Sequence, residues 1–179
     1  MLIPCYFQNF AEGKLVDWKW FQAHNITERF AFGHGLSYST FRWADLVFID
    51  GYKEDNTSIQ RTNERFHGGG QYDSIYDVIG TAYIDVTNTG TMRAAEVAQL
   101  YITFPEEETD GQPPRLLRGF DKLWLQPGET KRASFPLRRK DVSIFDVGAN
   151  EWRLPSGEVT LSVGSSSVAI HSTTTNIFV

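Results

Sequence analysis

Short segments in which apolar and polar residues alternate constrain the fold of this chain more than any other feature. Ala82, Ile84 and Val86, for example, fall on one face of a segment whose intervening side chains are polar or aromatic. A period of two is typical of a β-strand with one buried face. Asn88-Thr-Gly90 follows as a turn, and similar turn residues separate the later segments. We therefore predict an all-β fold, an antiparallel immunoglobulin or fibronectin type III-like β-sandwich of about seven strands.

The remaining strands are expected in segments rich in aromatic and branched residues. They lie at 42–49, 96–104, 133–137, 151–163 and 168–179, and 116–125 is expected to be a strand pair or one bent strand. The segment 151–163 is predicted to be a hairpin that turns at Pro155 and Gly157, and Asp141 is expected to begin one helical or 3₁₀ turn. Trp124 and Trp152 sit in apolar strand patterns and are predicted to fill the core.

Residues 1–40 differ from the rest and are predicted to form an irregular N-terminal extension. Aromatic residues are dense here, and Gly33 and Gly35 bracket a histidine and permit a tight backbone path. We expect Phe30–Phe41 to form an extended, well-packed loop instead of a helix. Trp18 and Trp20 are spaced to face the same side of a strand, but packing against another domain explains them equally well. The predicted boundaries are residues 1–40 for the extension and 41–179 for the sandwich.

Net charge and cysteine content exclude several classes of function. The 179-residue chain has a formal net charge of −5, which argues against a nucleic-acid partner or an anionic membrane surface. Its single cysteine, Cys5, excludes an internal disulfide and any site built from several cysteines. No apolar run approaches the roughly 20 residues of a membrane span, so no membrane partner is expected. The first residues lack the basic start of an export signal.

Residue types that commonly carry catalysis are scattered. The densest acidic group, Glu106–Glu108 with Asp110, lies among prolines and is expected to be a solvated loop tip instead of a catalytic pair. The four histidines lack metal-binding spacing, and His34 is expected to pack within its loop. Gly68-Gly-Gly70 is not followed by the lysine of a phosphate-binding loop. We therefore predict no catalytic residue, no metal site and no cofactor in this chain.

The motif Phe30-Ala-Phe-Gly-His-Gly-Leu-Ser-Tyr-Ser-Thr-Phe41 resembles a hallmark of family three glycoside hydrolases, above all the fungal β-glucosidases. The stretch Asp17–Ile26 resembles the end of that family's α/β sandwich domain, which implies that residues 1–40 are a remnant of it. Further motifs resemble, in order, the family's C-terminal fibronectin type III-like domain: Val86–Gly90, Glu96–Tyr101, Leu117–Phe120, Leu125–Gly128, Arg139–Asp141 and Pro155–Gly157.

In that family a barrel supplies an aspartate nucleophile and the α/β sandwich supplies an acid/base glutamate. Nothing in this chain matches either, although hydrolysis of terminal β-D-glucosyl residues needs both carboxylates about 5 Å apart. The resemblance therefore implies a non-catalytic structural part of a β-glucosidase, with the missing catalytic domains as partners. It also implies a secreted glycoprotein, in which Asn25 and Asn56 of two Asn-x-Ser/Thr sequons are candidate glycosylation sites.

The aromatic residues support a second hypothesis, a stand-alone module that binds polysaccharide or lignin. Such a module needs a flat row of solvent-facing rings, and Trp18 and Trp20 are its first candidates. A structural domain has no such requirement. The exposure of these rings therefore separates the two hypotheses.

Overall fold

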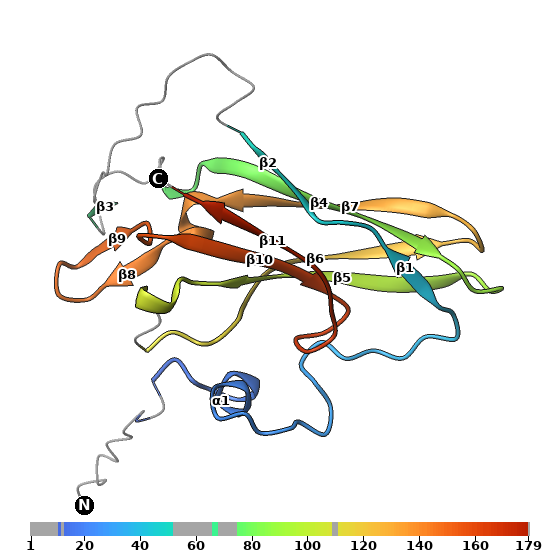
Figure 1. The fold of residues 1–179 in the computed structure, drawn as a ribbon, viewed down its shortest axis with the longest axis horizontal. Helices are drawn as coiled ribbons and strands as arrows, with labels where there is room; N and C mark the ends of the chain where they lie inside the picture. The colour runs from blue at the N-terminus through green and yellow to red at the C-terminus, as the bar shows by residue number, and fades with distance from the viewer. Residues whose placement is uncertain (1–10, 12, 52–65, 68–74, 109–110, 179) are drawn as a thin grey trace, which may run out of the picture.

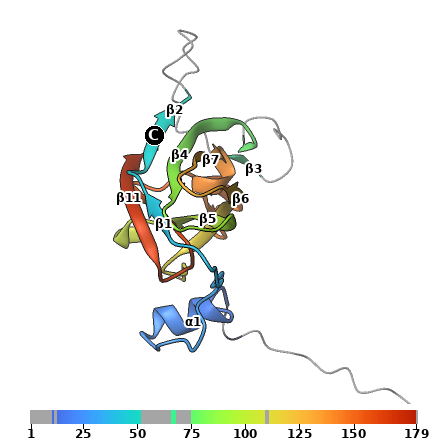
Figure 2. The same cartoon turned by 90° about the vertical axis from the view of Figure 1, so that its right-hand side faces the viewer.

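The computed structural model describes residues 11, 13–51, 66–67, 75–108 and 111–178. Antiparallel strands form two larger sheets that face each other, with a small third sheet at one end (Figure 1). Residues 11 and 13–40, called the N-terminal strip below, lie outside the sheets and carry the helix α1 (Trp18–Ala23) (Figure 2). No helix among the described residues has the length and apolar character needed to cross a bilayer.

The first sheet is built around β4 (Val78–Asn88). Strand β7 (Thr130–Arg138) pairs with one edge of β4, and β1 (Phe41–Trp43) and β2 (Val47–Asp50) follow each other along the other edge. Because β1 and β2 share an edge, the four strands of this sheet fill three positions.

The second sheet has the order β11–β10–β5–β6. Its strands are β5 (Ala94–Thr103), β6 (Leu116–Leu125), β10 (Glu158–Gly164) and β11 (Ile170–Ile177). The two larger sheets contain four strands each and every pairing is antiparallel, so the predicted antiparallel sandwich is confirmed, with eight strands where about seven were expected. Strand β10 pairs with β5 only from Gln99 to Thr103, so residues 94–98 have no strand partner from the described residues on that edge.

Alternation builds the core between the two sheets. In β4, Ala82, Ile84 and Val86 are at most 1% exposed, and the side chains between them face outward, as predicted. Strand β7 contributes a second row: Ala133, Phe135 and Leu137. Full burial of a Val, Leu or Ile side chain stabilises the fold by about 1.5–3 kcal/mol, so these rows hold the two sheets together.

The prediction that Trp124 fills the core is wrong. Strand β6 alternates, so Leu123 and Leu125 face the core while Trp124 points outward and is 48% exposed. The charged groups of Arg93 and Lys122 lie 4.9 and 5.2 Å from the centroid of its indole ring. Cation–π contacts therefore replace burial at this position.

The predicted hairpin over 151–163 is also wrong. Its first half, β9 (Glu151–Arg153), pairs with β8 (Ile144–Asp146) and β3 (Phe66–His67) in the small sheet. Its second half is β10, which pairs with β5 and β11. Pro155 has no N–H to donate, so the chain leaves one sheet here and enters another. Trp152 is half-buried in the small sheet, edge-on to Phe145, and lies outside the main core.

A 3₁₀ turn forms near the predicted position but begins earlier. It is η2 (Arg139–Val142), and the Asp141 carboxylate accepts a hydrogen bond from the N–H of Arg138 at 2.8 Å. A second short 3₁₀ helix, η1 (Glu106–Glu108), follows β5.

Helix α1 rules out the alternative that Trp18 and Trp20 face the same side of a strand. Six residues are too few for a helix that is stable alone, and Asp17 provides no side-chain cap. Tertiary packing supplies the stability instead, because Trp18 is buried against the sandwich. Successive helical side chains point in different directions, so Trp20 faces away, 40% exposed. From Phe30 to Thr40 the strip contains no helix or strand, as predicted, but this loop is not well packed, because Leu36 and Tyr38 are 94 and 96% exposed.

Candidate docking surface

Trp18 anchors the N-terminal strip to the second sheet. Its ring stacks on Phe32 with centroids 4.8 Å apart and meets Tyr101 of β5 edge-on at 6.2 Å. Trp18 is 7% exposed and Tyr101 is fully buried. Each aromatic pair at such distances adds about 0.5–1.5 kcal/mol beyond the burial itself. One aromatic side chain thus fixes α1 on the sandwich.

The side-chain amide of Gln99 holds the glycine-rich loop of the strip. Its Nε2 donates to the carbonyls of Gly33 and Ser165 at 3.0 and 2.8 Å, and its Oε1 accepts from the Tyr101 hydroxyl at 2.6 Å. Burial raises the pKa of Tyr101 to about 12, so this hydroxyl keeps its proton and remains a donor at neutral pH. All three bonds are shielded from water, because Gln99 is itself buried.

Ser167, in the connection between β10 and β11, makes a second attachment point. Its N–H donates to the carbonyl of Phe32 at 2.9 Å. Its carbonyl accepts from the side chains of Gln22, at 3.3 Å, and Arg115. The sandwich therefore holds the strip through both the helix and the loop.

Gly33 is restricted to glycine for two independent reasons. Its φ of +76° is in the left-handed region, and a Cβ added there would lie 2.0 Å from Oε1 of Gln99. At Gly35, by contrast, an added Cβ would meet no atom within 4 Å, and φ is not left-handed.

Gly33→Ala is expected to lower the free energy of unfolding by about 2–3 kcal/mol, from left-handed strain and from displacement of the buried Gln99 amide. Urea unfolding followed by tryptophan fluorescence measures this change. Gly35→Ala is the matched control and should stay within about 0.5 kcal/mol of wild type. Equal stability of the two variants would show that the fit assigned to Gly33 is wrong.

The C-terminal end of the strip is held by Asn88, which is fully buried. Its Oδ1 accepts from Ser39 Oγ at 2.6 Å and from the Gly90 N–H at 3.0 Å. Its Nδ2 donates to the carbonyls of Met92 and Leu125 at 2.8 and 3.1 Å. A Cβ on Gly90 would lie 2.1 Å from Ser39 Oγ, so the turn needs glycine there. One side chain thereby joins the strip, the turn after β4 and strand β6.

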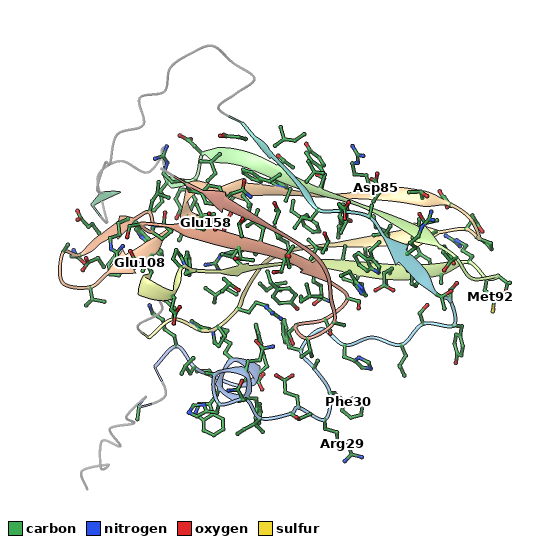
Figure 3. The ribbon with its side chains drawn as sticks, in the orientation of Figure 1. Arg29, Phe30, Asp85, Met92, Glu108 and Glu158 are labelled. Atoms are coloured by element: carbon green, nitrogen blue, oxygen red, sulfur yellow. The ribbon has the colours of Figure 1, made fainter. Side chains whose placement is uncertain are left out.

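The strip carries exposed apolar side chains. Four of them are called the outer face below: Trp20, Phe21, Ile26 and Phe30, which are 40, 38, 43 and 72% exposed. The ring of Trp20 stacks on the ring of His24, which is also part of the strip, with the two centroids 4.1 Å apart. Phe30 and the neighbouring Arg29 point away from the sheets (Figure 3). Exposed apolar groups gathered in this way are typical of an interaction surface.

Trp18 and Trp20, the candidates for polysaccharide binding, and the exposed Trp124 do not offer an open row of rings. Trp18 is buried, and Trp20 is stacked on His24. Trp124 lies under the cations of Arg93 and Lys122. Stacking of a sugar needs a ring face that is free, so this geometry does not favour the binding-module hypothesis.

Of the acidic residues that the structure describes, Glu151 alone is buried. It is the register partner of Asp146 across the β8–β9 turn. The Asp146 carboxylate accepts from the N–H of Ala149 at 3.0 Å and lies 3.8 Å from Nε of Arg153. These contacts give Asp146 a structural role in closing the turn.

The acidic loop departs from the prediction at Glu108. Glu106 is exposed, as expected of a solvated tip, but the Glu108 carboxylate accepts from Arg153 Nη1 at 2.7 Å and from Ser156 Oγ at 3.0 Å. These hydrogen bonds, chiefly those from Arg153, lower the pKa of Glu108 to about 2. Glu108 thus clamps η1 to the segment that follows β9. Asp110 lies outside the described residues.

Glu108 is expected to make stability fall at acid pH. Its pKa is about 2 in the folded protein against an ordinary 4.5, so folding favours the ionised form. This contribution is fully present above pH 4.5 and is lost as the pH falls through about 2. Urea unfolding at several pH values should show a steeper decline for wild type than for Glu108→Gln. Glu158→Gln, at an exposed acid, should keep the wild-type slope, and identical slopes for wild type and Glu108→Gln would rule out this role.

Of the other residues singled out in the sequence, the structure describes Asn25 and His34. Asn25 follows α1 and is exposed, with a φ of +53°, whereas Asn56 and Gly68–Gly70 lie outside the described residues. His34 is exposed, and its ring centroid is 6.1 Å from that of Phe30. The His, Cys, Asp and Glu side chains of the described residues form no group of three able to hold a metal ion.

Comparison with known proteins finds that this chain is similar to part of proteins named as β-glucosidases. The fibronectin type III-like domain family matches residues 96–167. "Probable beta-glucosidase D" of Aspergillus niger is 42% identical over 159 residues, which are 89% of this chain and 20% of that protein. "Probable beta-glucosidase G" of Emericella nidulans is 40% identical over 170 residues, again 20% of its length. The chain thus spans about a fifth of the curated relatives it matches.

Solved structures agree with the sequence matches. The beta-D-glucoside glucohydrolase of Trichoderma reesei aligns with a TM-score of 0.83 and 35% identity, over 99% of this chain and 24% of that one. The beta-glucosidase D2-BGL of Chaetomella raphigera gives 0.82 and 39%, over 94% and 23%. The resemblance stated from the motifs is therefore confirmed: this chain resembles the C-terminal, fibronectin type III-like part of fungal β-glucosidases.

Proposed function

We propose that this chain is the non-catalytic C-terminal part of a β-glucosidase of glycoside hydrolase family three, and that it supports the catalytic domains of that enzyme. The observation that carries the proposal is the match of 89% of this chain to a fifth of a protein named as a β-glucosidase. The parent would hydrolyse terminal β-D-glucosyl residues in the breakdown of cellulose and related carbohydrates.

The chemistry of the described residues supports a structural role. Retaining hydrolysis needs one carboxylate as nucleophile and a second as acid/base, about 5 Å apart across the substrate. Glu151 is the single buried acid here, and its partner Asp146 is engaged in a turn. Both catalytic carboxylates would then come from the rest of the parent enzyme.

The outer face of the strip is the surface that we assign to contact with the catalytic domains. Residues 1–40 would be the end of the preceding α/β domain, and residues 41–179 the fibronectin type III-like domain. Trp18 and Gln99 fix the strip on the sandwich, which leaves Trp20 and Phe30 turned toward a neighbour. The strip would thus act as a rigid connection between the two domains.

A chimeric enzyme tests this assignment. This chain would replace the matching 159 residues of the Aspergillus niger protein, and the chimera should fold and hydrolyse an aryl β-glucoside. Trp20→Ser with Phe30→Ser should lower the melting temperature of the chimera but not that of the isolated chain, because only the chimera buries these rings. Phe120→Ser, at a ring that is 70% exposed on β6, is the control. An inactive chimera would contradict the proposal. So would an equal loss of melting temperature in the chimera and in the isolated chain for the Trp20→Ser, Phe30→Ser variant.

We further propose that the parent is secreted and carries glycans at Asn25 and Asn56. Asn25 is exposed beside the outer face, where an oligosaccharide can be attached. Expression in a secreting fungal host, followed by endoglycosidase treatment, should reduce the mass by two glycans, and Asn25→Gln should remove one of them. An unchanged mass would refute both sites.

A further inference from the structure

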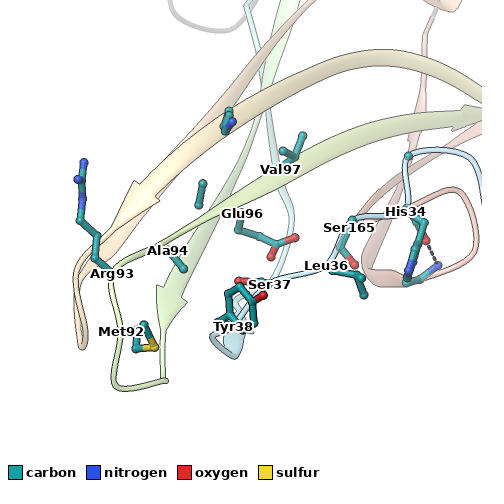
Figure 4. Close-up of a pocket in the computed structure, with 16 residues that line it drawn as sticks. His34, Leu36, Ser37, Tyr38, Met92, Arg93, Ala94, Glu96, Val97 and Ser165 are labelled. Carbon is teal, nitrogen blue, oxygen red and sulfur yellow. Dashed lines mark hydrogen bonds between the residues drawn. The ribbon is translucent and has the colours of Figure 1, made fainter.

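A pocket of about 530 Å³ lies between the strip and the first half of β5 (Figure 4). One wall is Ala94–Val97, the stretch of β5 that β10 does not reach. The opposite wall is residues 33–38, a strap held at one end by Gln99 and beyond its other end by Asn88. The volume is within the range of about 300–1,000 Å³ that is typical of small-molecule sites.

Glu96 is the acidic group of this pocket. Its carboxylate points toward Ser37 and Tyr38 on the strap (Figure 4). Partial burial raises the pKa of Glu96, and a hydrogen bond from the Val97 N–H lowers it in part. In the described part of the chain no cation pairs with this carboxylate. A half-buried carboxylate with spare acceptor positions favours a ligand that donates hydrogen bonds.

Two basic residues on the same wall limit the charge of that ligand. Arg93 and Lys122 line the pocket, although their charged groups lie over the ring of Trp124. Their positive charge disfavours a cation, and Glu96 disfavours an anion. A neutral ligand is therefore the best electrostatic fit.

The strap supplies groups that suit a polyhydroxyl ring. Ser37, Ser165 and Tyr38 contribute hydroxyl groups, which both donate and accept hydrogen bonds. Leu36 and Tyr38 are 94 and 96% exposed, and nothing in the described residues covers them. The C–H face of a sugar ring would shield both side chains while its hydroxyl groups reach the carboxylate.

We propose that this pocket binds one neutral sugar ring, a pyranose, with Glu96 accepting hydrogen bonds from two of its hydroxyl groups. All the residues that line the site belong to this chain. It does not depend on the proposed function, since the strap and β5 form the pocket without another domain.

Titration of the ¹⁵N-labelled chain with methyl β-D-glucopyranoside, followed by amide chemical shifts, tests the proposal. Saturable shifts are expected at residues 34–38 and 94–97, with a dissociation constant in the millimolar range for so small a ligand. Glu96→Ala should weaken binding by about tenfold or more, because hydrogen bonds to a charged acceptor are lost. If Glu96→Ala does not fold, Glu96→Gln, which keeps the shape of the side chain, takes its place in the comparison with wild type. Glu158→Ala, at an exposed acid, should bind as wild type does.

Charged probes complete the experiment. L-Arginine methyl ester and acetate, titrated in the same way, should cause no saturable shift at the pocket. Tighter binding of either probe than of the glucoside would overturn the proposal. So would the absence of saturable shifts with the glucoside, or equal affinities of wild type and Glu96→Ala.

Discussion

Asn88→Ala is expected to lower the free energy of unfolding by about 3–5 kcal/mol, the largest effect of any single polar substitution considered for this chain. The substitution removes four hydrogen bonds, to Ser39, Gly90, Met92 and Leu125. It also leaves partners without a bond in a region shielded from water, where each such group costs about 1–3 kcal/mol. The melting temperature should fall by roughly 10 °C.

Thermal and urea unfolding, monitored by circular dichroism, measure this loss. Thr87→Ala is the matched control, because among the described residues the Thr87 hydroxyl pairs with the exposed Thr130 hydroxyl alone, at 2.8 Å. The control should remain within about 0.5 kcal/mol of wild type. A loss below 1 kcal/mol for Asn88→Ala would mean that Asn88 is not the junction between strip and sandwich.

Trp18→Ala is the second large change. It removes the ring that packs between Phe32 and Tyr101, at a cost of about 3–5 kcal/mol to the docked strip. We expect the strip to detach while the sandwich stays folded, because the core residues of the two sheets are not touched. Amide hydrogen exchange over residues 13–38 should accelerate strongly, and binding of a hydrophobic dye should increase.

Trp20→Ala is the control for this experiment. Trp20 is 40% exposed and stacks only on residues of the strip, so its loss should leave amide protection of the strip nearly unchanged. The two variants remove the same side chain two positions apart, on opposite sides of α1. Similar exchange rates in both variants would disprove the anchoring role of Trp18.

The sandwich could be predicted from sequence because its strands carry a signal of period two. Ala82, Ile84 and Val86 alternate with outward-facing residues, and β4 is buried as that pattern requires. The error at 151–163 has a different origin. Two segments joined by a short turn usually pair with each other, but here the clamp of Glu108 on Arg153 and Ser156 holds the connection elsewhere. That contact spans 45 residues or more and has no local sequence signal.

Helix α1 shows a second limit of sequence reasoning. Its six residues carry no periodic pattern long enough to indicate a helix, and its stability comes from the contact of Trp18 with a distant strand. Trp18 and Trp20 were spaced as on a strand, yet a helix places them on different sides. Tertiary packing thus decided the secondary structure of this segment.

The attachment of the strip was only partly predictable. Glycines of the Phe30–Phe41 motif indicated a tight path, but the reason for Gly33 lies in Gln99, 66 residues away in the chain. Gln99 is a polar residue within a largely apolar strand segment, which is a sign of buried hydrogen bonding, whereas Asn88 was predicted as a turn residue and lies at the end of β4. Their partners are set by how the sheets pack, and a single sequence contains no record of that.

The outer face and the pocket follow from the same arrangement. Because the strip is fixed from within by Trp18, Gln99 and Asn88, its other side must face solvent or a neighbour. The strap it forms also encloses the pocket beside Glu96. A structural part of a glycosidase and a small sugar site are compatible, since they use different residues of the strip.

Hydrolysis of p-nitrophenyl β-D-glucopyranoside by the purified 179-residue chain tests the claim that this chain has no catalytic carboxylates of its own. Both carboxylates are proposed to lie in the rest of the parent enzyme, so release of nitrophenol should equal the rate without protein. We expect that protein purified by either of two different routes releases nitrophenol no faster than the blank without protein. Turnover that copurifies with the chain through both routes, and that is lost in Glu151→Gln, would contradict the claim.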